Sequence, residues 1–111
     1  MTRSPVVRLS ILRTDPDQFS RVREAMEAAL DALEPGIRAL DGLIDFFAGA
    51  DEATCALTNV SLWRGLDQAR QLDHFQPMLD LAPRFVALGA RFERPIINAS
   101  TLWRIDAATG A

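Results

Sequence analysis

The sequence predicts an α+β fold in which one layer of helices covers one face of an antiparallel sheet. The first observation is the order strand, long helix, two strands joined by a turn, helical stretch and strand, which fills all 111 residues. The second is that the predicted second and third strands carry almost no charge on either face, which is typical of strands buried on both sides. One domain over residues 1–111 has helices for a single sheet face only. We therefore expect a βαββαβ sandwich whose second face is covered by a partner.

The first strand is expected over residues 6–12. Val7, Leu9 and Ile11 alternate there with polar residues, so that one face of the strand is suited to a core. A long amphipathic helix follows, with Asp15 as its N-cap and Pro16 at its first helical position. Its apolar residues recur at spacings of three and four, which indicates a helix lying on a sheet. A Pro-Gly pair at 35–36 predicts an interruption, and Asp-Gly at 41–42 predicts the reversal into the next strand.

The second and third strands are expected over residues 43–48 and 54–63, with a turn between them. The second helical stretch, 65–88, is expected to be broken into pieces over 66–72 and from Pro77 onward. Pro83 predicts a kink or restart because it removes a backbone donor. The last strand is expected over 95–105, with Trp103 at a dimer interface.

Composition excludes several classes of function. The net charge is −3 and basic residues are scattered singly, which argues against nucleic-acid binding. No apolar run approaches membrane-spanning length, and no signal-peptide pattern follows the first residues. A lone cysteine, Cys55, indicates a reducing cytoplasm, and a single cysteine with a single histidine argues against a transition-metal site. We expect a cytoplasmic protein without metal or cofactor, whose partners are a second copy and a small apolar or aromatic molecule.

Asn59 and Trp63, four residues apart on the third strand, form the one constellation that indicates chemistry. A buried amide without a partner costs about 1–3 kcal/mol, so Asn59 is either satisfied by the protein or reserved for a ligand. Trp63 is alternatively an aromatic that seals the core. His74 is the only histidine; it is a candidate general base if it reaches a pocket, and otherwise caps a helix.

Three short motifs carry a resemblance to a known family. They are Gly-Leu-Ile at 42–44 entering the second strand, Leu-Trp at 62–63 closing the third, and His-Phe at 74–75 opening the next helical piece. In these the chain resembles the antibiotic-biosynthesis-monooxygenase-like family of dimeric α/β barrels, over its whole length. The resemblance implies a ferredoxin-like protomer with a four-stranded antiparallel sheet. It also implies a homodimer packed through the sheet faces.

The cofactor-free, quinone-forming branch of that family has an Asn and a Trp at this spacing on the third strand. By this resemblance Asn59 would donate a hydrogen bond to a substrate oxyanion or to the peroxide formed. Trp63 would add an indole donor and a flat surface, and Arg84 would assist. Leu57 and Phe75 would help to bind an aromatic or quinol-type substrate. The chain contains no Tyr, whereas that branch uses one in its pocket.

Two functions of different class remain open. A cofactor-independent monooxygenase predicts an open cavity bordered by Asn59, Trp63 and His74. A non-catalytic dimeric module, binding a small ligand or serving a stress-related role, predicts that Asn59 is satisfied by protein groups and that Trp63 is packed solid. The haem-degrading branch of the same family is excluded, because it needs an Asn on the first strand and a Trp on the second helix.

Overall fold

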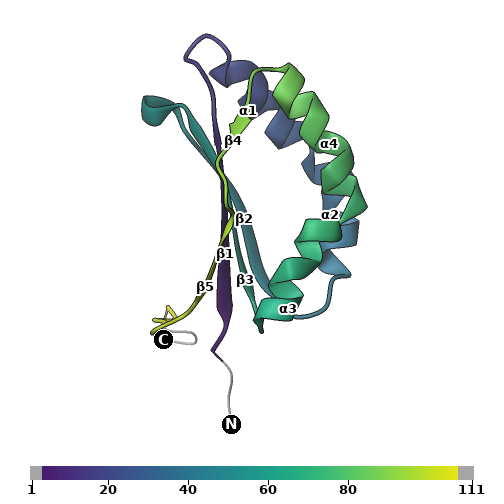
Figure 1. Ribbon diagram of the computed structural model, residues 1–111, viewed down its shortest axis with the longest axis vertical. Coiled ribbons are helices and arrows are strands. Elements are labelled where there is room, and N and C mark those ends of the chain that lie inside the picture. Colours follow the sequence, from purple (N-terminus) through teal and green to yellow (C-terminus); the bar gives the residue numbers. More distant parts are fainter. Residues whose placement is uncertain (1–3, 108–111) are drawn as a thin grey trace.

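A computed structural model describes residues 4–107 as one antiparallel sheet with all its helices on a single face (Figure 1). The strands are β1 (Val6–Arg13), β2 (Leu43–Asp51), β3 (Ala56–Trp63), β4 (Arg91–Phe92) and β5 (Ile97–Ser100). The helices are α1 (Phe19–Ala28), α2 (Leu30–Arg38), α3 (Leu66–Ala69) and α4 (Gln76–Ala87), with 3-10 turns η1 (Glu52–Thr54) and η2 (Arg70–His74). The expected α+β, ferredoxin-like arrangement is confirmed. No helix in the described range is long and apolar enough to cross a membrane.

The sheet has the order β2-β3-β1-β4, and β5 also pairs with β1. β4 pairs with the end of β1 and β5 with its beginning, so the two short strands share one edge position. Pro95 lies between them and has no N–H to donate to a ladder. The prediction of one strand over 95–105 is therefore wrong at both ends. The edge strand stops at Ser100 because its neighbour β1 begins at Val6, which pairs with Ser100.

The predicted strand boundaries in the central hairpin also shift. β2 continues three residues beyond the expected end, to Asp51, and β3 begins at Ala56 after the turn η1. The Asp51 carboxylate accepts a hydrogen bond from the Ala53 N–H at 3.2 Å, which stabilises this turn.

The predicted break before Pro77 is confirmed, since α4 begins at Gln76, but the interruptions predicted at Pro35-Gly36 and at Pro83 are wrong. α1 begins at Phe19, three residues after the expected start, and the break before α2 falls at Ala29. Gly36 lies inside α2, where a Cβ atom would come 2.7 Å from the ring of Phe75. This glycine thus allows α2 to contact Phe75 and does not end the helix. α4 continues through Pro83, which is exposed, so that the carbonyl left without a donor can bond to water.

Two apolar clusters lie between the sheet and the helices, one toward each end of the central strands. Leu12 and Leu57 belong to the first cluster, together with residues of α1 and α4. Val6 and Trp63 belong to the second, together with residues of α3 and η2. The middle of the helix-facing surface of β1 and β3 therefore lies between the two cores.

The opposite face of the sheet has no helices over it and is mostly apolar (Figure 1). Because side chains alternate along a strand, the residues between Val6 and Leu12 that face away from the helices are Val7, Leu9 and Ile11. The apolar face of the first strand is thus the uncovered one, and its polar residues face the interior. The large apolar residues of the uncovered face are Val7, Leu9, Ile11, Phe47, Val60, Leu62 and Ile97, and its register also places Asp45 and Thr58 there. Phe47 and Ile97 are more than half exposed, at 59% and 51%.

Candidate functional site

Four polar side chains occupy the middle of the helix-facing surface, where a sandwich of this kind ordinarily has apolar residues. Arg8 and Ser10 come from β1, and Asn59 and Ser61 come from β3. Ser10 is the cross-strand partner of Asn59, and Arg8 is the partner of Ser61. We call these four residues the polar centre. They lie together because both strands present every second residue to the helices.

Adjacent cavities surround Asn59 between the sheet and the helices. One, of about 340 Å³, lies between α2 and β2 and is called here the α2 cavity. A second, of about 170 Å³, lies between β1 and the start of α4 and is called the Arg8 cavity. A smaller cavity of about 50 Å³ lies toward the first core cluster. Asn59 and Met78 line all three, so the space around the Asn59 amide extends in more than one direction.

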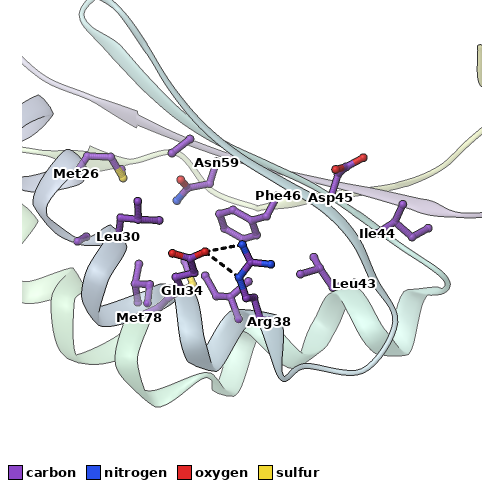
Figure 2. Close-up of a pocket in the computed structure, with 14 residues that line it drawn as sticks. Met26, Leu30, Glu34, Arg38, Leu43, Ile44, Asp45, Phe46, Asn59 and Met78 are labelled. Carbon is purple, nitrogen blue, oxygen red and sulfur yellow. Dashed lines mark hydrogen bonds and ion pairs between the residues drawn. The ribbon is translucent and has the colours of Figure 1, made fainter. Parts of the chain in front are cut away.

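The Asn59 side chain has no hydrogen-bond partner among residues 4–107, and Figure 2 shows its amide directed into the α2 cavity. The nearest labelled neighbours in that view are apolar, with Met26, Leu30 and Met78 on the helices opposite. A primary amide carries two donor hydrogens and an acceptor oxygen. The arrangement leaves all of these groups available to a molecule within the cavity.

The walls of the α2 cavity also carry charged groups. The Arg38 Nη2 atom lies 2.6 Å from the Glu34 Oε2 atom, one helical turn away on α2 (Figure 2). Asp45 of β2 borders the same cavity, but it pairs with Leu62 and its carboxylate points to the other side of the sheet (Figure 2). The Arg38 side chain is exposed, so this ion pair borders an opening toward solvent and adds little to stability. The α2 cavity thus has an apolar body, one unpartnered amide and a charged rim.

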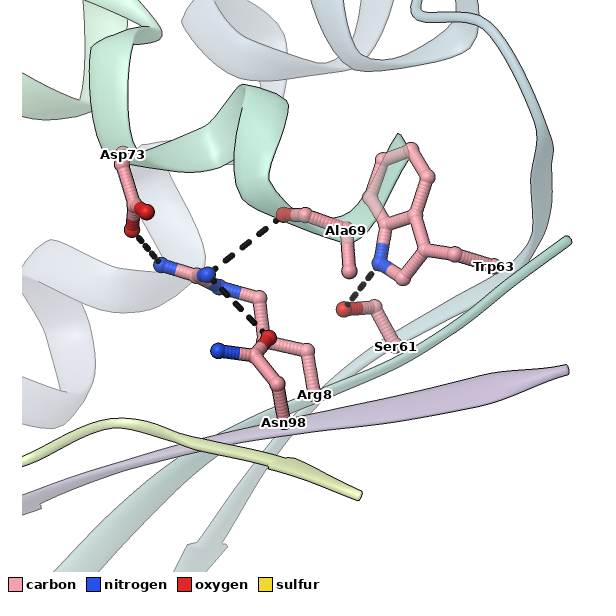
Figure 3. Close-up of polar contacts among 6 residues, drawn as sticks. All are labelled: Arg8, Ser61, Trp63, Ala69, Asp73 and Asn98. Atoms are coloured by element: carbon pink, nitrogen blue, oxygen red, sulfur yellow. Dashed lines mark hydrogen bonds and ion pairs between the residues drawn. The ribbon is translucent and has the colours of Figure 1, made fainter. Parts of the chain in front are cut away.

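Arg8 is the residue that the sequence analysis missed. It is 5% exposed, and its Nη2 atom lies 2.7 Å from the Asp73 Oδ1 atom (Figure 3). Its Nη1 atom donates to the Asn98 Oδ1 atom at 3.3 Å and to the Ala69 carbonyl at 3.4 Å. The signal that could have revealed it is the antiparallel register, which places the polar residues of β1 beside those of β3.

Trp63 is fully buried and lies apart from these cavities. Its indole N–H donates to the Ser61 Oγ atom at 2.7 Å, and none of its surface is exposed (Figure 3). It packs in the second core cluster beside Val6 and Leu72. The indole donor is therefore engaged within the protein, and the ring faces other side chains.

The remaining predicted residues are not brought together with Asn59. His74 is exposed at the end of η2 and borders none of the cavities found between residues 4 and 107. Arg84 is exposed and borders a shallow hollow between α4 and α1. Leu57 is fully buried in the first core cluster, and Phe75 packs beneath α2. The expected cavity bordered jointly by Asn59, Trp63 and His74 is thus not found; Asn59 alone reaches a cavity. Within the described range, no group of three or more His, Cys, Asp or Glu side chains could hold a metal ion.

Neither a protein-family model nor a curated protein matches the sequence. Solved structures do match. A monooxygenase from the gene ActVA-Orf6 of Streptomyces coelicolor, solved with nanaomycin D, has a TM-score of 0.68 and 15% identity over 96% of this chain and 95% of that one. A candidate antibiotic biosynthesis monooxygenase from Deinococcus radiodurans has a TM-score of 0.69 and 12% identity, covering 94% and 99%. Rv0793 from Mycobacterium tuberculosis has a TM-score of 0.60 and 23% identity, covering 96% and 100%. The chain therefore has the ferredoxin-like fold of the antibiotic-biosynthesis-monooxygenase-like proteins, as its sequence resemblance predicted.

Proposed function

We propose that the protein is a cofactor-independent monooxygenase that oxidises a small aromatic or quinol-type substrate in the α2 cavity. The observation that carries the proposal is the Asn59 amide, which has no partner in the described chain and is directed into an apolar cavity. The amide reaches solvent, so water can pair with it in the free protein, and a ligand that enters the cavity would take the place of that water. The fold, which this chain shares with a monooxygenase of Streptomyces coelicolor, supports the same reading.

In the proposed reaction an anthrone-type substrate first loses a proton, and its electron-rich anion reduces dioxygen directly. A carbon–oxygen bond forms to give a hydroperoxide. Loss of water then converts the former CH₂ carbon into a carbonyl, so that one oxygen atom enters the substrate and the other leaves as water. The Asn59 amide donates to the oxyanion of the substrate. Such a donor acts most strongly in a cavity from which water is excluded.

We also propose that two copies of the chain pack through their uncovered faces. The face is mostly apolar, with Asp45 and Thr58 as its polar residues on the central strands, and Phe47 and Ile97 on it are more than half exposed. Apolar surface of this extent is typical of an interaction site. A two-fold axis would bury the same residues of both copies. Leu62→Glu should yield a monomer by analytical ultracentrifugation, whereas Val86→Glu, on the exposed side of α4, should leave a dimer. A monomeric wild-type protein would contradict the proposal.

The proposed activity is tested with anthrone, by oxygen uptake above the uncatalysed background. Asn59→Ala should lower the catalysed rate by about 10²-fold, the usual loss when one oxyanion donor is removed. Asn98→Ala is the matched control, because its amide oxygen already accepts from Arg8. The control should retain the wild-type rate with this uncharged substrate. An unchanged rate in Asn59→Ala would refute the role of the amide.

A non-catalytic ligand-binding module is the second candidate. It is favoured by one observation, the complete burial of Trp63 with its indole N–H engaged by Ser61. This candidate predicts that 2-naphthamide binds to the α2 cavity and that anthrone is consumed no faster than in buffer. Turnover that depends on Asn59 would exclude it.

A further inference from the structure

The Arg8 cavity adjoins the Asn59 amide and has several charged groups in its lining. It shares Phe46, Asn59 and Met78 with the α2 cavity, so a molecule placed against Asn59 lies at the border of both. The charged groups are two guanidinium groups, Arg8 and Arg94, against one carboxylate, Asp73. These three side chains come from β1, η2 and the segment between β4 and β5, which are distant in sequence and meet only in the fold.

Arg8 retains hydrogen-bonding capacity toward this cavity. A guanidinium has five N–H donors. Those of Arg8 form one short contact, to Asp73, and two longer ones of 3.3 and 3.4 Å, to Asn98 and Ala69. The Asp73 side chain that balances its charge is itself 44% exposed. A cation that is 5% exposed and lines a cavity is therefore only partly compensated by the protein.

Arg94 adds a second positive charge to the lining of the cavity. It forms no ion pair with any residue from 4 to 107, and its guanidinium lies 5.5 Å from the centre of the Phe92 ring, in a cation–π contact. Phe92 pairs with Leu12, whereas Asn98 pairs with Arg8, so the two guanidinium groups line different parts of the same cavity. The charged side chains of the lining sum to an excess of one positive charge, which favours an anion.

We propose that the Arg8 cavity binds the carboxylate of an aromatic carboxylic acid whose apolar rings lie against Asn59. The planar fork of an arginine matches a carboxylate with two parallel hydrogen bonds, which fixes orientation as well as affinity. The anionic group would thus set which edge of the rings faces the Asn59 amide. This inference rests on the proposed function, which makes the α2 cavity beside Asn59 a substrate site. It adds the chemical class of the molecule bound.

Isothermal titration of the full-length protein with two probes of equal shape tests the proposal. 2-Naphthoate carries the carboxylate, and 2-naphthamide replaces it with a neutral amide. The wild-type protein should bind 2-naphthoate about tenfold more tightly, as expected for charge-assisted hydrogen bonds in a partly buried site. Arg94→Gln and Arg8→Gln should each reduce this preference severalfold. Arg94 is exposed, so its variant keeps the test valid if the Arg8 variant does not fold.

Asp73→Asn gives a prediction of opposite sign. If Asp73 competes with the ligand for Arg8, removing its charge should strengthen 2-naphthoate binding and leave 2-naphthamide binding unchanged. If the Arg8–Asp73 pair serves stability alone, the variant should melt at a lower temperature without this gain, and the proposal fails. Arg91→Gln is the matched control, because Arg91 is exposed nearby on β4 and lines none of the cavities around Asn59.

The outcomes separate this proposal from the one on which it rests. Equal affinities for the two probes in the wild-type protein would overturn the carboxylate site. They would leave the α2 cavity as a site for neutral aromatic molecules. An equal loss of preference in Arg91→Gln and Arg94→Gln would show attraction by overall charge, and would also overturn it. Failure of both probes to bind would overturn the carboxylate site together with the ligand-binding role of the cavity.

Discussion

Replacing Asn59 with leucine should make the protein more stable and less active. The amide has no partner in the described chain and reaches solvent, so replacing it breaks no hydrogen bond within the protein. Leucine has a similar size and would pack against Met26 and Met78, with about 340 Å³ of adjacent space to accommodate its branched end. Burying it contributes about 1.5–3 kcal/mol if complete, and Asn59 is only partly buried. We expect a net gain of about 1 kcal/mol in the free energy of unfolding, since this burial is only partial.

The assay is urea denaturation at one fixed protein concentration, because the stability of the proposed dimer would depend on concentration. The midpoint should rise without a change in slope. Asn98→Leu is the control: it removes an acceptor of the buried Arg8 guanidinium, so its midpoint should fall. A loss of stability of 1 kcal/mol or more in Asn59→Leu would refute the reasoning, since it would mean that the amide is satisfied within the protein or that the cavity does not exist.

Two further predictions concern residues that support the site. Ser61→Ala should destabilise the protein by about 1–2 kcal/mol in urea denaturation, because it leaves the buried Trp63 indole N–H unpaired. The rate of anthrone oxidation should change less than twofold. A large loss of rate would place Trp63 in the chemistry. Gly36→Ala should cost about 1–3 kcal/mol, because the new methyl group would overlap the ring of Phe75, and Phe75→Leu should recover part of that loss in the double variant. Additive losses in the double variant would show that the two residues do not contact each other.

Strand alternation predicted the fold class and most of the strands, but it could not tell which face of a strand meets the helices. The apolar residues Val7, Leu9 and Ile11 suggested the core, yet they lie on the uncovered face. A strand with one apolar face has two ways to bury it, against helices or against another copy, and its own pattern is the same in both cases. From the sequence alone, the polar face with Arg8 and Ser10 is therefore expected to be exposed to solvent. Only the register with β3 shows that it faces the helices.

The candidate site was predicted only at Asn59, for a related reason. Spacing placed Asn59 and Trp63 on the same face of β3, and the structure confirms this placement. Two pleats separate them, however, so that one reaches the cavities and the other the second core cluster. Helix positions were less predictable. Proline and glycine usually interrupt helices. α4 nevertheless continues through Pro83, which is exposed to solvent, and α2 continues through Gly36, which packs closely on Phe75.

The central claim is that the Asn59 amide contacts a bound aromatic molecule. The sequence contains two asparagines, Asn59 and Asn98, so selective ¹⁵N labelling of asparagine yields two side-chain amide pairs in an NMR spectrum. The Asn59 pair is assigned as the one that disappears from the spectrum of Asn59→Ala. Titration with 2-naphthamide should shift that pair and leave the Asn98 pair nearly unmoved. A bound naphthamide that shifts only Asn98, or neither pair, would contradict the account.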